Sequence, residues 1–457
     1  MTKHSDRDNR RFDDEGNTRP AGSNYISVDH SEDGLDRRGF LRCMAWAGTA
    51  TVWALSGGIP KSFAIGRAAL LSEAEKKSIF FAQISDSHIG FNKEANTNVT
   101  ATLEEAVGKL NALPHAPAFL LHTGDITQLA KPDEFDTANE VLKGVKTDRI
   151  FYVPGEHDVA TDNGVSYLQR YGKGTKGQGW YSFDHHGVHF VGLVNVLGLK
   201  AGGLGSLGAE QLAWLRDDVG HLSSSTPIVL FAHVPLWTVY PEWGWGTDDS
   251  EAALALVKRF GSVTVLNGHI HQIMQKVEGH VSFHTALSTA FPQPAPGTAP
   301  SPGPLKVAPE RLRSVLGIAD VAFVPGRGTL AIVDGTLSGE APGMVMGPGQ
   351  SSGAGRGLKL GPNEIGIDNF QFTPPTLTVK PGTSVTWVNG DDVPHLIASA
   401  DGHFQSSKLL DTGNRFTVSF PKGGTYSYFC SLHPQMQGKV VVAGSNATNG
   451  VPFRCLT

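Results

Sequence analysis

Two patterns of apolar and polar residues follow one another along this chain of 457 residues. Between residues 78 and 337, short apolar runs alternate with segments in which apolar residues recur every three or four positions. The runs predict buried strands, and the recurring spacing predicts amphipathic helices. Beyond about residue 360, apolar and polar residues alternate between Gly- and Pro-rich turns. We therefore expect an α/β domain followed by a smaller all-β domain.

Strands and helices alternate in the first region. The expected strands are 79–85, 117–124, 149–155, 227–236, 262–272 and 328–337, with a hairpin at 179–196 and helices at 97–113, 133–145, 208–222 and 250–260. This order predicts two packed sheets with helices on their outer faces, a four-layer α/β sandwich. We interpret the Pro- and Gly-rich residues 292–327 as a surface loop with a short helical patch at 308–317, although such a segment could also cover a cleft.

Composition sets the expected domain boundaries. Residues 338–362 are rich in Gly, Ser and Pro, which is typical of a flexible linker between a domain at 78–337 and another at 363–445. The period-two alternation of the second domain predicts a small β-sandwich. With 38 basic and 43 acidic residues the net charge is −5, which gives no basic footprint for nucleic acid.

The first 68 residues predict a polar tail and an export signal. The sequence "RRGFLR" begins at Arg37, and a modestly apolar stretch from Cys43 to Leu55 follows it. That stretch is shorter than the roughly 20 residues that cross a bilayer as a helix, so we expect no stable membrane anchor. The arrangement resembles a twin-arginine signal, which implies export to the periplasm and cleavage near residues 62–69. A basic surface helix is the alternative.

Five short polar segments stand at the ends of expected strands. Their candidate metal ligands are Asp86, His88, Asp125, Glu156, His233, His269 and His271, and His157 and Asp158 lie beside them. The first four segments follow strands directly and the fifth ends one, so we expect all of them at one edge of the layered sheets. Carboxylates together with imidazoles suit divalent Zn, Mn or Fe, and two such ions can clamp both oxygens of a phosphoryl transfer.

These segments, "SDSH", "TGD", "GEHD", "FAHVPL" and "GHIH", resemble as a set the motifs of calcineurin-like metallophosphoesterases. The resemblance covers residues 79–337 and implies a dinuclear metal site that acts on a small-molecule phosphoester. It implies that Asp86, His88 and His271 hold one ion, that Glu156, His233 and His269 hold the other, and that Asp125 bridges them. His157 would contact the phosphoryl group and protonate the leaving oxygen, and Asp158 would orient His157.

Glu156 departs from the Asn that the family's motif has at this position. As a ligand, the longer and charged Glu would hold the second ion more tightly and make it a weaker Lewis acid. Alternatively, the side chain would swing away and leave that ion weakly held. The residue therefore bears on metal identity and on activity.

A second group of ligands lies in the all-β domain. "CSLHPQM" contains Cys430, His433 and Met436, and His395 lies 35 residues before the cysteine. A thiolate, two imidazoles and a thioether describe a His2Cys copper site with an axial Met. The alternative is a disulfide between Cys430 and Cys455, which would explain neither histidine. Since Cys43 is the remaining cysteine, the chain has no disulfide framework.

This region resembles the cupredoxins over residues 363–444, and its ligand loop is similar to that of amicyanin. The resemblance implies that His395, Cys430 and His433 are equatorial copper ligands, that Met436 is axial, and that the site exchanges electrons, with a redox carrier as a possible partner. We therefore expect an exported phosphoesterase with an accessory type 1 copper domain. The alternative is a copper electron-transfer protein whose phosphoesterase domain is weakly active or only binds phosphate.

Other aromatic and polar residues have open roles. Trp237, Trp243 and Trp245 could stack on a substrate ring or pack in the core. We interpret His185 and His186 as hairpin residues. We also interpret His284 as a residue with a structural role, and the alternative is that it lines the substrate pocket.

Overall fold

The computed structural model describes the side chains of residues 78–323, 330–340, 342 and 358–443. It also describes the backbone of a hairpin formed by β1 (Thr51–Ser56) and β2 (Ile59–Ala64), which overlaps the end of the predicted export signal. The twin-arginine motif, Cys43, Cys455 and most of the predicted linker lie outside the described residues.

Two sheets form the centre of the first domain. In spatial order, the first sheet contains β13 (Leu330–Thr336), β12 (Gly317–Phe323), β3 (Ile79–Ile84), β4 (Leu120–His122) and β5 (Ile150–Tyr152). The second contains β10 (Gln275–Glu278), β11 (Val281–Thr285), β9 (Val263–Asn267), β8 (Ile228–Phe231), β7 (Val188–Gly192) and β6 (Tyr181–His185). Strands β3, β4 and β5 are parallel, as are β7, β8, β9 and β11.

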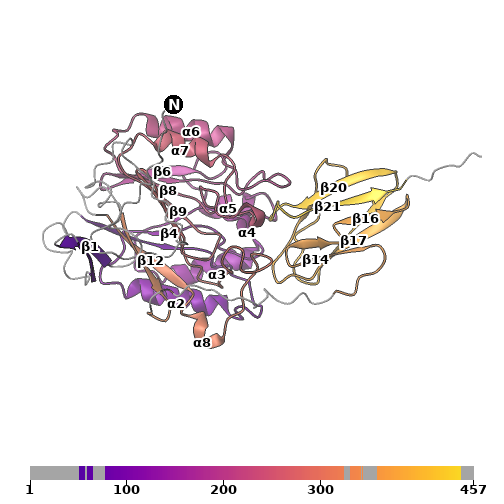
Figure 1. Cartoon of the computed structure of the whole chain (residues 1–457), viewed down its shortest axis with the longest axis horizontal. Helices are drawn as coiled ribbons and strands as arrows, with labels where there is room; N and C mark the ends of the chain where they lie inside the picture. The colour runs from indigo at the N-terminus through magenta and orange to yellow at the C-terminus, as the bar shows by residue number, and fades with distance from the viewer. Residues whose placement is uncertain are drawn as a thin grey trace, which may run out of the picture. The chain divides into compact units, whose positions relative to one another are not determined.

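Helices cover the outer faces of both sheets, and an apolar core joins the inner faces (Figure 1). The helices are α2 (Val99–Asn111), α3 (Pro132–Leu142), α6 (Gly208–Gly220) and α7 (Ser250–Val257), with shorter ones at α4 (Glu156–Val159), α5 (Val165–Tyr171), η3 (Pro241–Trp243) and α8 (Pro309–Leu312). Phe81, Phe190 and Phe231 are completely buried between the sheets. The predicted four-layer α/β architecture is therefore confirmed.

Local sequence explains where the two long helices of the first sheet begin. The side chain of Asn98 accepts a hydrogen bond from the backbone N–H of Ala101 and caps α2. Pro132 occupies the first turn of α3, where a missing N–H costs nothing. Val99, Leu103 and Leu110 lie on the buried face of α2, with the spacing that the sequence pattern predicted.

The expected surface loop at 292–327 is wrong at its C-terminal end. Residues 317–323 form β12, which pairs with β3 on one side and β13 on the other. The Pro and Gly content of the surrounding segment obscured a short alternating stretch, "GIADVAF", that the sheet completes. The hairpin of β10 and β11 and the short helix α5 were also not predicted.

The second domain is the predicted β-sandwich. One sheet contains β15 (Gln371–Thr373), β14 (Glu364–Asp368), β17 (Thr383–Asn389) and β19 (Arg415–Phe420), and the other contains β16 (Thr376–Val379), β21 (Gln437–Val442), β20 (Gly424–Cys430) and β18 (Ile397–Ser399). Trp387 and Tyr428 are buried between the sheets, with ring centroids 5.0 Å apart. Cys430 lies at the end of β20, so the core itself positions the thiol.

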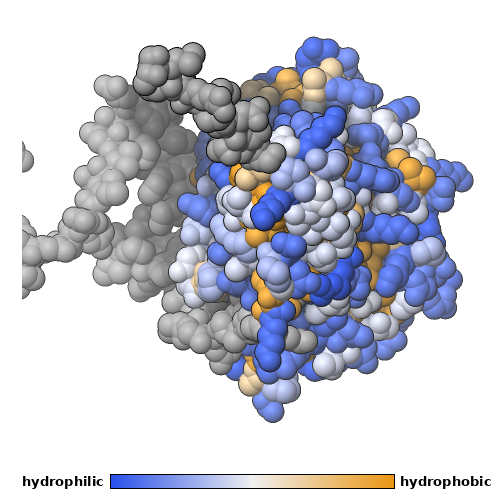
Figure 2. Space-filling view, turned by 90° about the vertical axis from the view of Figure 1, so that its right-hand side faces the viewer, coloured by the Kyte–Doolittle hydropathy of each residue, from blue (hydrophilic) through white to orange (hydrophobic). Residues whose placement is uncertain are grey.

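One face of the described surface is mostly polar (Figure 2). On the face drawn in Figure 2, hydrophilic residues predominate and apolar residues form small separate groups. Among the helices of the described residues, none combines the length and the apolar character that crossing a bilayer requires.

Candidate metal centres

Five turns bring the predicted ligands of the first domain together. Asp86 and His88 follow β3, Asp125 follows β4 and Glu156 follows β5, all at the carboxyl ends of parallel strands. His233 follows β8 in the other sheet. The "GHIH" segment was expected to end a strand, but β9 ends at Asn267, so His269 and His271 also lie in a turn. The two sheets therefore deliver their ligands to a common edge.

The backbone of these turns is unusual. Asp86, His88, Asp125, His269 and His271 all have positive φ, between 41° and 71°. Residues with a Cβ rarely adopt this conformation, and it occurs most often at functional sites. A Cβ at Gly155 would overlap Asp125, and one at Gly268 would lie 2.7 Å from Oδ2 of Asp86. The tight turns therefore need glycine next to the ligands.

The first group contains Asp86, His88 and His271. Nε2 of His271 lies 3.3 Å from Oδ1 of Asp86 and 3.2 Å from Nε2 of His88. All three side chains are buried, and the three can offer ligand atoms within 4.8 Å of one another. This is the grouping that the family resemblance implies for one ion.

The second group contains Glu156, His233 and His269. One carboxylate oxygen of Glu156 lies 3.0 Å from Nε2 of His233, and the other lies 3.0 Å from Nδ1 of His269. The side chain of Glu156 therefore points into the cluster in this structure rather than away from it. Glu156 is also the first residue of the one-turn helix α4, so its backbone is not part of an irregular loop.

Asp125 lies between the two groups. Its Oδ2 atom is 3.5 Å from Nε2 of His88 and 3.4 Å from Nε2 of His233. Its other oxygen accepts a hydrogen bond of 3.0 Å from the backbone N–H of His157. A carboxylate in this position can contact ions on both sides.

The far ring nitrogens of three histidines are bound to oxygen acceptors. Nδ1 of His88 lies 2.9 Å from Oε1 of Gln128, Nδ1 of His233 lies 2.7 Å from the carbonyl of Thr123, and Nδ1 of His271 lies 2.6 Å from the carbonyl of Phe291. With Nδ1–H donating, Nε2 keeps its lone pair for a cation. Gln128 was not among the predicted site residues, because its role depends on the fold placing it beside His88.

His157 and Asp158 are both buried, but they are not hydrogen-bond partners. Nδ1 of His157 donates to the carbonyl of Gln128 at 2.9 Å, and its Nε2 lies 4.0 Å from Oδ2 of Asp125. The carboxylate of Asp158 instead accepts hydrogen bonds from the backbone of Gly155, Ile126 and Thr127 and from the Thr127 hydroxyl. The predicted orienting role of Asp158 is therefore taken by a carbonyl, and Asp158 fixes the ligand turns.

The electrostatics of the cluster favour anionic carboxylates. Burial would raise the pKa of Asp86, but His271, His233 and His88 outweigh it and lower that pKa. Burial likewise opposes ionisation of Glu156, yet His269 and His233 hold its pKa well below the usual value. Burial, helped by the neighbouring His157 and His271, outweighs Asp125 and Asp86 and lowers the pKa of His88 to about 3, so this imidazole is neutral at pH 7. Ionised carboxylates and a neutral imidazole in a buried cluster are the donors that a divalent cation needs.

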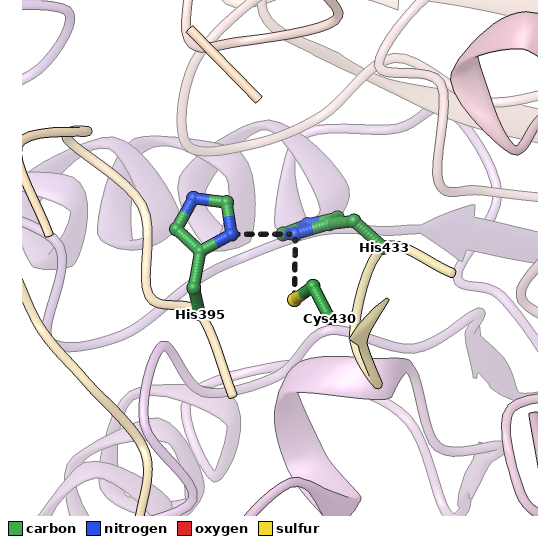
Figure 3. Close-up of side chains that lie close together, drawn as sticks. All are labelled: His395, Cys430 and His433. Atoms are coloured by element: carbon green, nitrogen blue, oxygen red, sulfur yellow. Dashed lines mark hydrogen bonds between the residues drawn. The ribbon is translucent and has the colours of Figure 1, made fainter. Parts of the chain in front are cut away.

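The second domain gathers its predicted ligands at one end of the sandwich. Nδ1 of His433 lies 3.4 Å from Nδ1 of His395 and 3.7 Å from Sγ of Cys430, so His433 stands between the other two (Figure 3). Met436 is buried in the same core as Cys430, and its backbone N–H donates to the carbonyl of His433 at 2.9 Å. Two imidazoles and a thiol that converge in this way fit a copper ion.

Neighbouring groups hold this arrangement. Nε2 of His395 lies 2.9 Å from Oδ2 of Asp391, which leaves Nδ1 for the metal. Burial would raise the pKa of Cys430, but the hydrogen bond and charge of His395 lower it, helped by the N–H of Leu396 at 3.5 Å from Sγ. Cys430 is a free thiol in the described part of the chain. Asp391 was not among the predicted site residues.

A small cavity opens beside the ligands of the first domain. Trp243 and Trp245 line it, whereas Trp237 packs against Phe283 in the core behind the second sheet. His284 pairs with Asp334 at 3.0 Å and is not among the residues around the cavity. The hairpin interpretation of His185 and His186 is confirmed. Trp237 therefore packs in the core, whereas Trp243 and Trp245 pack with Ile270 and also border the cavity.

Comparison with known proteins agrees with both centres. Amicyanin from Paracoccus versutus is 34% identical over 82 residues, which are 17% of this chain and 62% of that protein, so the chain spans less than two thirds of this relative. Amicyanin-alpha from Methylorubrum extorquens is 35% identical over 91 residues, 18% of this chain and 72% of that protein. Glycerophosphodiester phosphodiesterase GpdQ from Enterobacter lignolyticus is 24% identical over 225 residues, 47% of this chain and 79% of that protein.

Two family models match separate parts of the chain. Residues 81–273 match the calcineurin-like phosphoesterase family, and residues 361–443 match the copper-binding proteins of the plastocyanin/azurin family. The matches cover both candidate metal centres. The chain therefore contains a calcineurin-like phosphoesterase domain at residues 81–273 and, through its second domain, belongs to the plastocyanin/azurin family of cupredoxins.

Proposed function

We propose that the protein is an exported, metal-dependent phosphoesterase that hydrolyses phosphomonoesters or phosphodiesters, with an accessory type 1 copper domain. The observation that carries this proposal is the position of Asp125, whose Oδ2 atom lies 3.5 Å from His88 and 3.4 Å from His233. One carboxylate between two buried ligand groups is the arrangement that a pair of divalent ions requires. Domain limits at 78–337 and 363–445 complete the proposal.

In this proposal, Asp86, His88 and His271 would hold one divalent ion, Glu156, His233 and His269 would hold the other, and Asp125 would be shared by the two groups. Two divalent ions of the Fe, Mn or Zn kind would supply a nucleophile at neutral pH and positive charge for the phosphoryl oxygens. The 3.0 Å contacts of Glu156 with His233 and His269 support its role as a ligand. The buried hydrogen bonds of the histidines set the ring orientations before a substrate arrives.

His157 is the proposed catalytic residue outside the two ligand groups. Its Nδ1 atom is held by the Gln128 carbonyl, and its Nε2 atom lies 4.0 Å from the shared carboxylate of Asp125. The ring is therefore fixed beside the place where a phosphoryl group would bind. There it contacts a phosphoryl oxygen and gives a proton to the departing oxygen of the ester. Asp158 positions the turn on which His157 and Asp125 depend.

The substrate proposal draws on the comparisons. A relative that covers almost half of this chain is named a glycerophosphodiester phosphodiesterase, which supports small phosphodiesters as substrates. We propose a periplasmic location because the chain carries a twin-arginine motif and a cupredoxin domain. The copper domain would exchange single electrons with a redox carrier.

Turnover of a chromogenic phosphodiester tests the enzyme proposal. The full-length protein with Mn²⁺ should hydrolyse bis(para-nitrophenyl) phosphate, and Asp125→Ala should remove this activity because both ligand groups lose their shared carboxylate. Asp217→Ala is the matched control, since Asp217 is exposed and pairs with the neighbouring, equally exposed Arg216. Absence of turnover with Mn, Fe, Zn and Co would refute the proposal.

A copper electron-transfer role is the second candidate. It is favoured by the convergence of Cys430, His395 and His433, whose side-chain distances are 3.4 Å and 3.7 Å. Folded protein should gain a strong blue absorption band with Cu(II), and Cys430→Ala should abolish it. A folded protein without such a band would rule out the type 1 copper site.

A further inference from the structure

The copper end of the second domain contacts the loops around the phosphoesterase site. The N–H of Gly202 donates to the carbonyl of Pro434 at 2.6 Å, and the Ser301 hydroxyl donates to Oδ1 of Asn369 at 2.6 Å. Ala160, which follows α4, packs against the apolar core of the cupredoxin sandwich. These contacts come from three separate segments of the first domain, so the copper end is seated on the rim of the site.

Three residues of the copper domain line the cavity that the dinuclear ligands share. They are Phe370, Val393 and His433. The ring centroids of His433 and His157 are 6.4 Å apart, and His433 can place a ligand atom within 4.8 Å of Glu156 and His157. His433 belongs in the same way to the copper cluster. One side chain therefore borders both metal centres.

Asp391 connects the cavity wall to the copper site. Its carboxylate accepts hydrogen bonds from the backbone N–H groups of Asn369 and Phe370, the latter at 2.9 Å, and from His395 at 2.9 Å. Asn369 and Phe370 have positive φ, 55° and 56°, in the turn between β14 and β15. The Phe370 ring packs on His433 with centroids 4.7 Å apart. The wall is therefore part of the hydrogen-bonded scaffold that also holds His395 and His433.

The chemistry of the cavity limits what fits beside the metals. Apart from the ligands and His157, it is lined mainly by aromatic and apolar side chains, and none of its fifteen described lining residues is Lys or Arg. A second phosphate or a carboxylate would therefore find no Lys or Arg there to form a charge-assisted hydrogen bond. An apolar or aromatic group would contact Trp243, Phe291 and Phe370.

We propose that the cupredoxin domain forms a wall of the phosphoesterase pocket, and that Phe370 and Val393 select phosphoesters with a compact, uncharged, apolar or aromatic group. This inference rests on the proposed phosphoesterase function. It gives a reason for the fusion of the two domains, since the pocket is incomplete without residues 370, 393 and 433. It also means that the copper end faces a pocket of its own chain.

Direct binding of phenylphosphonate tests the wall without relying on turnover. The probe carries a phosphoryl group and one aromatic ring and is not hydrolysed as an ester. Calorimetry on the Mn-loaded full chain should show that Phe370→Ala raises the dissociation constant about ten-fold, because a lost apolar contact in a pocket is worth roughly 10- to 200-fold. Val393→Ala should act in the same direction with a smaller effect and guards against a folding defect in the first variant.

Kinetics and a matched variant complete the test. Phe370→Ala should raise KM for ethyl para-nitrophenyl phosphate by a similar factor and leave kcat within about three-fold, because the removed contact is made equally in ground and transition states. Phe416→Ala removes a ring that packs on Trp387 at 5.8 Å, far from the cavity lining, and should change neither constant. Near-ultraviolet circular dichroism checks that all three variants are folded.

The outcomes separate the two proposals. Turnover and phenylphosphonate binding that are both insensitive to Phe370→Ala and Val393→Ala would overturn the wall and leave the phosphoesterase intact. Phenylphosphonate binding that Phe370→Ala weakens, in a protein without turnover, would support the wall and overturn hydrolysis. Failure of the wild-type protein to bind phenylphosphonate would refute the proposed wall. The turnover measurement would then test the phosphoesterase proposal by itself.

Discussion

The two candidate metal centres of this chain are built in opposite ways. The proposed dinuclear ligands extend from Asp86 to His271, come from five turns on two sheets, and include five residues with positive φ. Three of the four proposed copper ligands lie between Cys430, the last residue of one strand, and Met436. A site assembled from many turns depends on the fold and on outer hydrogen bonds, whereas a site on one loop depends mainly on that loop. Substitutions of supporting residues should therefore affect the two centres unequally.

Loss of an outer partner should damage the dinuclear site most. Gln128→Ala removes the Oε1 atom that lies 2.9 Å from Nδ1 of His88, so the ring loses its fixed orientation. We expect a fall of roughly 10- to 100-fold in metal affinity or in kcat/KM. Metal titration and turnover measure this effect, while the blue copper band should stay unchanged. Equal loss at both centres would indicate general unfolding and would break the comparison.

Glu156→Asn should have an intermediate effect, confined to the second ion. Removal of the charge and of one methylene should lower the affinity for the second ion by about ten-fold, or about 1.4 kcal/mol. It should also raise kcat once metal is saturating. The reason is that Glu156 contacts both His233 and His269 at 3.0 Å. Metal-dependence curves of the activity supply both quantities. An unchanged metal affinity would show that Glu156 is not a ligand.

The smallest effect concerns a histidine that belongs to neither centre. Burial would lower the pKa of His189, but hydrogen bonds to Asp218 and Asp184 raise it above its usual value. A group with a raised folded-state pKa stabilises fully below its unfolded pKa, about 6.5, and this contribution is lost as pH rises through the folded value. Asp218→Asn should therefore reduce the free energy of unfolding more at pH 6 than at pH 9, by less than about 1 kcal/mol because Asp184 is exposed.

Thermal unfolding at both pH values, with the metals present, measures this difference. Chelation of the metals should leave the pH dependence of the Asp218→Asn difference as it was, since the pair is remote from both centres. A difference that grows with pH would reverse the sign worked out for His189. The result would sharpen the comparison by showing how a hydrogen-bonded group of His and Asp residues outside both candidate metal centres changes stability with pH.

The sequence predicted the architecture well where periodicity was strong. The helix at 99–111 and the strands that carry ligands are clear in the pattern, because buried faces repeat at 3.6 or 2 residues. Strand β12 was lost because its seven residues lie in a Pro- and Gly-rich segment and gain their stability from pairing on both sides. Local sequence carries no record of such long-range pairing.

The same distinction holds for the sites. The ligand types and their spacing could be predicted because chemistry dictates them at each position. The roles of Asp158, Gln128 and Asp391 could not, since they depend on which donors and carbonyls the fold places nearby. The contact of His433 with the cavity beside His157 is the clearest case, because 276 residues separate the two histidines along the chain and they belong to different domains.

Metal analysis of natively produced protein and two variants tests the central claim most directly. The account predicts two divalent ions and one copper ion in the wild type, loss of the divalent ions but not of copper in Asp125→Ala, and the reverse in Cys430→Ala. Inductively coupled plasma mass spectrometry measures all of these in one experiment. Divalent metal retained in full by Asp125→Ala, or copper retained by Cys430→Ala, would contradict the claim that one chain carries two separate metal centres.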